Sequence, residues 1–141
     1  MEQWVVNKEE DYKDIMPEVA EFIVSSKIVL LNGEMGSGKT TFVRHLNQFL
    51  GADQASSPTF SIVNQYQYDN GIINHFDLYR LERADELSEI GFEEYLESGN
   101  LCLIEWPALG KNYYPENTII IEFSIIDKST RKLVLNSNIF K

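Results

Sequence analysis

The sequence predicts a single α/β domain over residues 1–141, with a mostly parallel central sheet, antiparallel hairpin extensions and flanking helices. Three observations predict this class. An apolar strand, a glycine-rich loop and a helix follow one another within residues 27–51. A second apolar run at 101–105 ends in an acid. Alternating segments around 69–71 and at the C-terminus have the signals of hairpins. A chain of 141 residues is most simply one domain.

The N-terminal elements are a short strand at 3–6 and an amphipathic helix at 9–25. Apolar residues recur at helical spacing along one face of the second segment: Tyr12, Ile15, Val19, Phe22 and Ile23. Pro17 is expected to start or bend this helix because proline lacks a backbone donor. "KIVLL" then predicts a buried strand, since it is short, apolar and ends at a glycine loop.

The next helix is expected over "TTFVRHLNQFL", with Gly51 as its stop. Its apolar face comprises Phe42, Val43, Leu46, Phe49 and Leu50. An alternating strand follows, with Phe60, Ile62, Tyr66 and Tyr68 in step, and "DNG" turns it into a return strand "IINHFD".

The remaining elements are a helix, a strand and a hairpin. Asp85 is expected to cap the helix "ELSEIGFEEYLES", which Gly91 weakens. "LCLIEW" predicts a buried strand, and "NTIIIEFSI" with "RKLVLN" predicts the C-terminal hairpin.

Composition and charge narrow the function classes. The net charge is −10, which disfavours stable binding to DNA or RNA by this chain alone and suits a basic protein partner. The single cysteine, Cys102, allows no internal disulfide and suits a reducing compartment. Neither a signal pattern nor an apolar run of membrane-spanning length is present, so we expect a cytoplasmic protein without membrane contact.

The loop "GEMGSGKT" has the Gly33-x-x-x-x-Gly38-Lys39-Thr40 spacing of a phosphate-binding loop. Its glycines let successive N–H groups face phosphate oxygens, and the next helix adds its dipole. Lys39 would reach the β- and γ-phosphates, and Thr40 would ligate Mg²⁺. A chance match is on the order of one in a few hundred at average glycine usage. A dinucleotide fingerprint fits less well, because it needs Gly or Ala where Thr41 stands.

Two acids end apolar strands and are candidates for the carboxylate that accompanies a phosphate loop. Glu105 is favoured as the metal-side residue, and Asp77 is expected to orient the attacking water or to bind the outer shell of the metal. Either acid is otherwise a strand-terminal residue that meets solvent.

The phosphate-binding loop is compatible with several classes of protein, and other sequence features distinguish among them. A GTPase needs Asn-Lys-x-Asp, which is absent. A small-molecule kinase normally carries lid arginines, and no segment here suits a lid. A non-catalytic interaction module would not need Lys39, Thr40 and Glu105 together. The best generic interpretation is an ATPase that switches a partner, with residues 53–60 as its moving part.

The ordered motifs "GEMGSGKTTF", "SPTF", "HFDLYRL", "DELSEIGFEEYL" and "CLIEWP" resemble those of the TsaE family, also called YjeE. The resemblance covers residues 28–107. It implies a P-loop NTPase fold and a weak ATPase that acts with TsaD and TsaB, the pair that forms threonylcarbamoyladenosine at position 37 of tRNA. It implies contact with tRNA only through that complex. A P-loop kinase and a self-sufficient ATPase remain as alternatives.

The resemblance also implies site residues, with ATP and Mg²⁺ as cofactors. Those of the phosphate loop are Gly33, Glu34, Met35, Gly36, Ser37, Gly38, Lys39, Thr40 and Thr41. Thr59 matches a switch-like threonine, Asp77 the essential aspartate, and Glu105 the metal-side glutamate. Trp106 matches a tryptophan near the base and is otherwise expected in the core. His75 is expected to be a structural strand residue. The acidic segment 82–97 is expected to be a solvated face, with docking to a basic partner as an alternative.

Overall fold

The structure is a computed structural model that describes residues 1–54 and 62–137. The elements in chain order are β1 (Glu2–Val6), α1 (Asp11–Ser26), β2 (Ile28–Asn32), α2 (Lys39–Leu50), β3 (Asp53–Gln54), β4 (Val63–Tyr68), β5 (Gly71–Asp77), α3 (Asp85–Glu89), α4 (Phe92–Glu97), β6 (Leu101–Glu105), the 3-10 helix η1 (Pro107–Gly110), β7 (Ile119–Ile125) and β8 (Arg131–Ser137).

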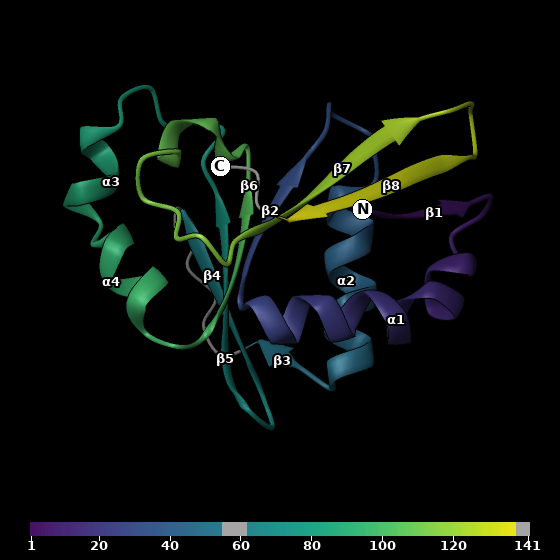
Figure 1. The fold of residues 1–141 in the computed structure, drawn as a ribbon, viewed down its shortest axis with the longest axis horizontal. Helices are drawn as coiled ribbons and strands as arrows, with labels where there is room; N and C mark the ends of the chain where they lie inside the picture. The colour runs from purple at the N-terminus through teal and green to yellow at the C-terminus, as the bar shows by residue number, and fades with distance from the viewer. Residues whose placement is uncertain (55–61, 138–141) are drawn as a thin grey trace.

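Within those residues, eight strands form one mixed sheet in the order β1-β8-β7-β2-β6-β5-β4-β3 (Figure 1). The central strands β7, β2, β6 and β5 run parallel. The predicted α/β class and both predicted hairpins are confirmed. The "mostly parallel" prediction holds only for the centre, because β1, β3 and the hairpins add antiparallel pairings on both flanks.

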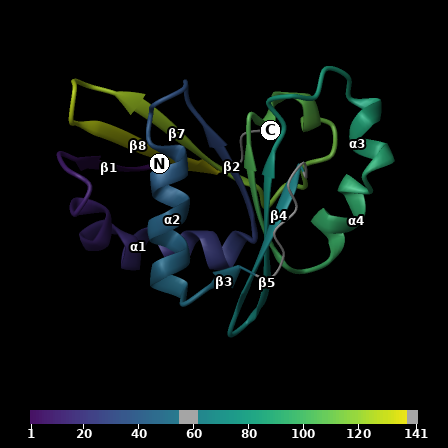
Figure 2. The same cartoon turned by 180° about the vertical axis from the view of Figure 1, so that it is seen from behind.

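Helices cover both faces of the sheet. Alternate side chains of β2 pack into two separate hydrophobic cores, one on each face. Val29 and Leu31 belong to the core that includes α1 and α2. Ile28 and Leu30 belong to the other core, with residues of α3 and α4. Figure 2 shows these two pairs of helices on opposite sides of the central strands. Burial on both faces explains why β2 is a continuous apolar run.

The first two helices differ from prediction in detail. Helix α1 begins at Asp11, and Pro17 lies inside it, on its exposed side. The fully buried Met16, Val19 and Ile23 lie on the opposite side, and their packing offsets a proline penalty of about 3 kcal/mol. Phe49 was expected on the apolar face of α2, but its position near the helix end leaves it 49% exposed.

The helix predicted over 86–98 is two short helices instead. Gly91 takes a left-handed φ of 74° and separates α3 from α4. Asp85 is also not the expected cap, since it is the first residue of α3 and pairs with Arg83 at 3.2 Å. The carboxylate of Glu86 instead accepts the N–H groups of residues 82 and 83.

The parallel centre of the sheet determines where a site can form. Strands β2, β5 and β6 all end at the same edge, where β2 continues into the loop of residues 33–38, here called the glycine loop. In open α/β sheets, ligands bind outside the carboxyl ends of such strands. No helix in the described part of the chain is long and apolar enough to cross a bilayer.

Candidate functional site

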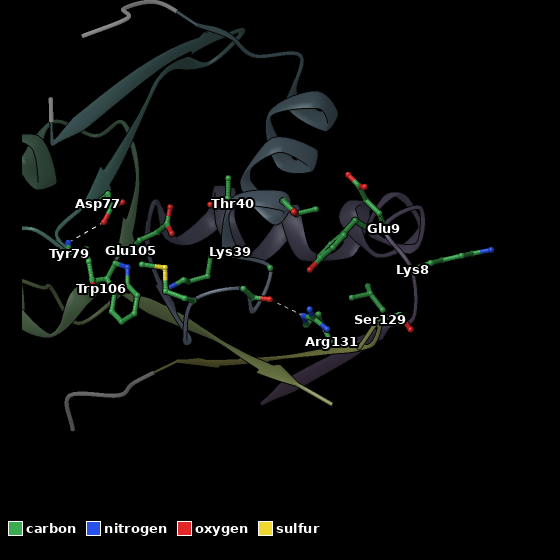
Figure 3. Close-up of a pocket in the computed structure, with 16 residues that line it drawn as sticks. Lys8, Glu9, Lys39, Thr40, Asp77, Tyr79, Glu105, Trp106, Ser129 and Arg131 are labelled. Atoms are coloured by element: carbon green, nitrogen blue, oxygen red, sulfur yellow. Dashed lines mark hydrogen bonds between the residues drawn. The ribbon is translucent and has the colours of Figure 1, made fainter. Parts of the chain in front are cut away.

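A cavity of about 390 Å³ lies at this edge of the sheet. Its walls are formed by Val6, Lys8, Glu9, Tyr12, Met35, Gly36, Gly38, Lys39, Thr40, Thr41, Asp77, Tyr79, Glu105, Trp106, Ser129 and Arg131. In Figure 3, Asp77, Glu105 and Trp106 lie on one side of Lys39, and Ser129 and Arg131 lie on the other. The cavity therefore has an acidic end and a second end, with the start of α2 between them.

The glycine loop leaves the N-terminus of α2 open to the cavity. Gly38 is the N-cap residue, and within residues 1–54 and 62–137 no side chain caps the first N–H groups of this helix. Thr40 is exposed at this terminus and Thr41 is partly buried. Free N–H groups and the helix dipole attract anions, so the terminus is suited to phosphate oxygens.

Two hydroxyl groups beside the glycine loop also lack partners within the described residues. The Ser37 side chain is fully buried, and neither its Oγ nor the buried hydroxyl of Tyr12 has a hydrogen-bond partner. Burial raises the pKa of Tyr12. Buried polar groups are seldom left unpaired in proteins, and Tyr12, whose hydroxyl lies beside Gly38, is one of the residues that line the cavity. Tyr12 therefore fits a polar ligand in the cavity, whereas Ser37 is not among the residues that line it.

Lys39 lies between the glycine loop and Trp106. Its Nζ donates a hydrogen bond to the carbonyl of Gly33 at 2.5 Å and lies 3.7 Å from the centre of the Trp106 ring. Desolvation lowers the pKa of Lys39, and the charges of Glu105 and Asp77 oppose this shift. The side chain was expected to reach the phosphates of a nucleotide. It does line the cavity, but it is only 6% exposed because the indole covers it.

The two predicted acids are neighbours. Asp77 and Glu105 are partners in the register of β5 and β6, and both line the cavity. Asp77 is exposed, and its Oδ1 accepts the backbone N–H of Tyr79 at 3.1 Å. Glu105 is 6% exposed, and its Oε2 lies 2.6 Å from Nε2 of His75. The arrangement offers one carboxylate near solvent and one that is held in place.

A metal ion here would depend on ligands beyond the protein. Within residues 1–54 and 62–137, no three His, Cys, Asp or Glu side chains gather closely enough to hold a metal. Magnesium commonly takes one or two protein carboxylates together with water and substrate phosphates. Thr40 and Glu105, which both line the cavity, could supply hydroxyl and carboxylate oxygens of that kind.

The other predicted site residues differ in how they relate to the cavity. Glu34 is exposed and lies outside its walls, and neither Gly33 nor Ser37 lines it. Trp106 is partly buried, packs against the core on the α3–α4 face, and also lines the cavity. Thr59 lies outside the described residues, as does most of the predicted moving segment 53–60.

Sequence reasoning missed the second end of the cavity. Arg131 follows the turn between β7 and β8, and its Nε donates to the carbonyl of Gly36 at 3.2 Å. Tyr12 reaches the cavity from α1, and its ring stacks on that of His45. No sequence signal identified these residues, because they approach the loop from distant parts of the chain.

The Gly38→Ala change is expected to weaken ligand binding and to lower the free energy of unfolding by about 1–3 kcal/mol. Gly38 has a φ of 107°, and an added Cβ would lie 2.7 Å from the Tyr12 hydroxyl. Gly99→Ala is a matched control, since Gly99 has a φ of 83° and an added Cβ there meets nothing within 4 Å. Urea unfolding measures both variants. If Gly38→Ala and Gly99→Ala lower the free energy of unfolding equally, the close approach to Tyr12 does not contribute to the destabilisation.

Comparisons with known proteins give a consistent result. The family model described as "Threonylcarbamoyl adenosine biosynthesis protein TsaE" matches residues 6–133. The chain is 36% identical to the tRNA threonylcarbamoyladenosine biosynthesis protein TsaE of Rickettsia felis, over 95% of this chain and 80% of that protein. It is 34% identical to the protein of that name from Aquifex aeolicus, over 94% of both chains. The crystal structure of Bacillus subtilis YdiB superposes with a TM-score of 0.69 at 23% identity, covering 97% of this chain and 85% of that one.

Proposed function

Since this chain belongs to the TsaE family of tRNA threonylcarbamoyladenosine biosynthesis proteins, we propose that it binds ATP with Mg²⁺ in the cavity around Lys39 and hydrolyses it slowly. The observation that carries this proposal is the convergence of a lysine, an open helix N-terminus and two carboxylates on one cavity. This proposal implies the fold of a P-loop NTPase. We expect the protein to act in the cytoplasm.

The shape of the cavity supports one orientation of the nucleotide. Lys39 and the first N–H groups of α2 would bind the β- and γ-phosphates. The terminal phosphate would then lie toward Asp77 and Glu105, and the nucleoside toward Ser129 and Arg131. In this orientation Trp106, which covers Lys39, meets the phosphate end. That geometry favours a role for the indole beside Lys39 over stacking on adenine.

The chain's own residues would then have separate tasks. Glu105 and Thr40 would hold the magnesium ion, which supplies charge stabilisation to the phosphates when bound. Asp77, whose carboxylate is exposed, would orient the attacking water. Lys39 would stabilise charge on the phosphate oxygens, and Trp106 would limit its access to water.

We further propose that nucleotide state is transmitted to TsaD and TsaB, with TsaD transferring the threonylcarbamoyl group to tRNA. The alternative of a small-molecule kinase receives little support, since Arg44, Arg80 and Arg83 are exposed and do not line the cavity. Arg131 does line it, but at the end away from Asp77 and Glu105. A second cation for the terminal phosphate, in addition to Lys39, would therefore come from a partner.

The Asp77→Ala and Glu105→Ala changes are expected to separate hydrolysis from metal binding. Asp77→Ala should keep ATP affinity and lose turnover by a factor of about 10²–10⁴. Glu105→Ala should weaken Mg²⁺-dependent ATP binding. Titration with a fluorescent ATP analogue and a phosphate-release assay measure the two effects.

Asp69→Ala is the control for this pair, because Asp69 is an exposed aspartate at the opposite end of the β4–β5 hairpin. It should change neither quantity. If Asp77→Ala loses binding and Glu105→Ala does not, the two roles are reversed. If both variants turn over ATP normally, the proposed site is wrong.

A further inference from the structure

A buried histidine contacts the proposed metal-side carboxylate. His75 on β5 and Glu105 at the end of β6 belong to adjacent parallel strands, and their side chains meet at 2.6 Å. The exposed fractions of these side chains are 11% and 8%. His75 has no role in the mechanism proposed above for Lys39, Asp77 and Glu105. It nevertheless lies two residues from Asp77 and therefore on the same face of β5.

The surroundings of the ring indicate which atom carries the proton. A carboxylate accepts hydrogen bonds, so Nε2 of His75 must present its N–H to Oε2 of Glu105. The other ring nitrogen, Nδ1, is buried and has no partner among the described residues. The contact with Glu105 therefore places a proton on Nε2.

The contact leaves Glu105 partly free and directs it away from Lys39. No hydrogen bond to its second oxygen, Oε1, is found in the described part of the chain. The charge of Glu105 acts on Lys39, yet the two side chains form no ion pair within 4.0 Å. Lys39 instead contacts Gly33 and Trp106. A glutamate without an anchor at this place would be attracted to the ammonium group.

We propose that His75 is a positioning residue that holds Glu105 by one oxygen, so that Glu105 and Lys39 do not pair and both remain available to the metal and the phosphates. This inference rests on the proposed function. Removing a residue that hydrogen-bonds to a metal ligand, and so orients it, typically lowers metal affinity by 10- to 100-fold.

Substitutions of His75 test the metal side of this inference. His75→Leu should raise the Mg²⁺ concentration needed for half-maximal ATP binding by about 10- to 100-fold. The amide of glutamine can still donate a hydrogen bond to Glu105, so His75→Gln should need nearly the same Mg²⁺ concentration as wild type. Cys102→Ala is the matched control, because Cys102 is fully buried on β6 but packs in the core on the other face of the sheet. It should leave the Mg²⁺ dependence unchanged.

The outcomes separate the inference from the function on which it rests. Wild-type protein that fails to bind ATP overturns both. Wild-type binding with an unchanged Mg²⁺ dependence in His75→Leu overturns the inference alone. The inference is also overturned if His75→Gln needs as much Mg²⁺ for ATP binding as His75→Leu does. The same holds if Cys102→Ala needs as much Mg²⁺ as His75→Leu, because the higher Mg²⁺ requirement would then reflect a loss of packing.

Nitrogen-15 NMR of the histidine rings tests the contact without ATP and without replacing His75. His75 should show a proton on Nε2 that exchanges slowly with solvent, and this slow exchange should be lost in Glu105→Ala. His45, the other histidine of the chain, serves as an internal reference because it contacts Glu9 instead. A His75 ring without a proton on Nε2, or a signal that is unchanged in Glu105→Ala, overturns the proposal.

Discussion

Replacing Lys39 by alanine is expected to lower ATP turnover by about 10²–10³-fold, the usual cost of removing one group that stabilises transition-state charge. Lys39 is the cation between the glycine loop and the two acids. Its loss leaves Asp77 and Glu105 facing the phosphates without a compensating charge, which should weaken binding as well. Steady-state phosphate release and ATP titration measure both effects.

Lys111→Ala is the control, because Lys111 is exposed and does not line the cavity. Circular dichroism should show that both variants keep the fold. Near-normal turnover in a folded Lys39→Ala protein would contradict the nucleotide-binding interpretation.

Adding TsaD and TsaB is expected to raise ATP turnover well above that of the isolated chain. A cation supplied to the terminal phosphate is worth about 10³–10⁵-fold in related phosphoryl-transfer enzymes. Among the described residues, Lys39 is the basic side chain near Asp77 and Glu105, and Arg131 occupies the other end of the cavity. The isolated chain should therefore be slow.

Thr59→Ala should reduce this stimulation more than it reduces ATP binding, since the TsaE resemblance gives Thr59 a switch-like role. Phosphate release at saturating ATP, with and without the partners, measures the effect for wild type and Thr59→Ala. Fast turnover in the isolated chain that the partners leave unchanged would support the alternative of a self-sufficient ATPase.

Local sequence patterns predicted most of the fold. The apolar runs of β2 and β6 are buried on both faces, and the turn after Tyr68 joins β4 to β5 as expected. The pattern failed where tertiary packing overrides local signals. Pro17 lies within α1 because the buried side of that helix outweighs its cost, and Gly91 divides a segment that periodicity alone joins.

The site was predictable where it follows from strand ends. Lys39, Asp77 and Glu105 were expected together, because parallel strands end at one edge, and they do line one cavity. Arg131 was not predictable, since only the folded β7–β8 hairpin brings it to the glycine loop. The period of two along β5 places His75 on the face of Asp77, and that signal could have identified it.

The side-chain N–H signals of the two tryptophans offer the most direct test of where ATP binds. Trp106 covers Lys39 in the cavity, whereas the Trp4 indole donates to Glu18 outside it. Adding ATP and Mg²⁺ to the isolated protein, with the signals assigned by Trp106→Phe, should shift the Trp106 signal in a saturable manner and leave that of Trp4 in place. The Lys39→Ala protein should show no such shift at the same ATP concentrations. An unchanged Trp106 signal in a wild-type protein that binds ATP would contradict the proposal that this cavity is the nucleotide site.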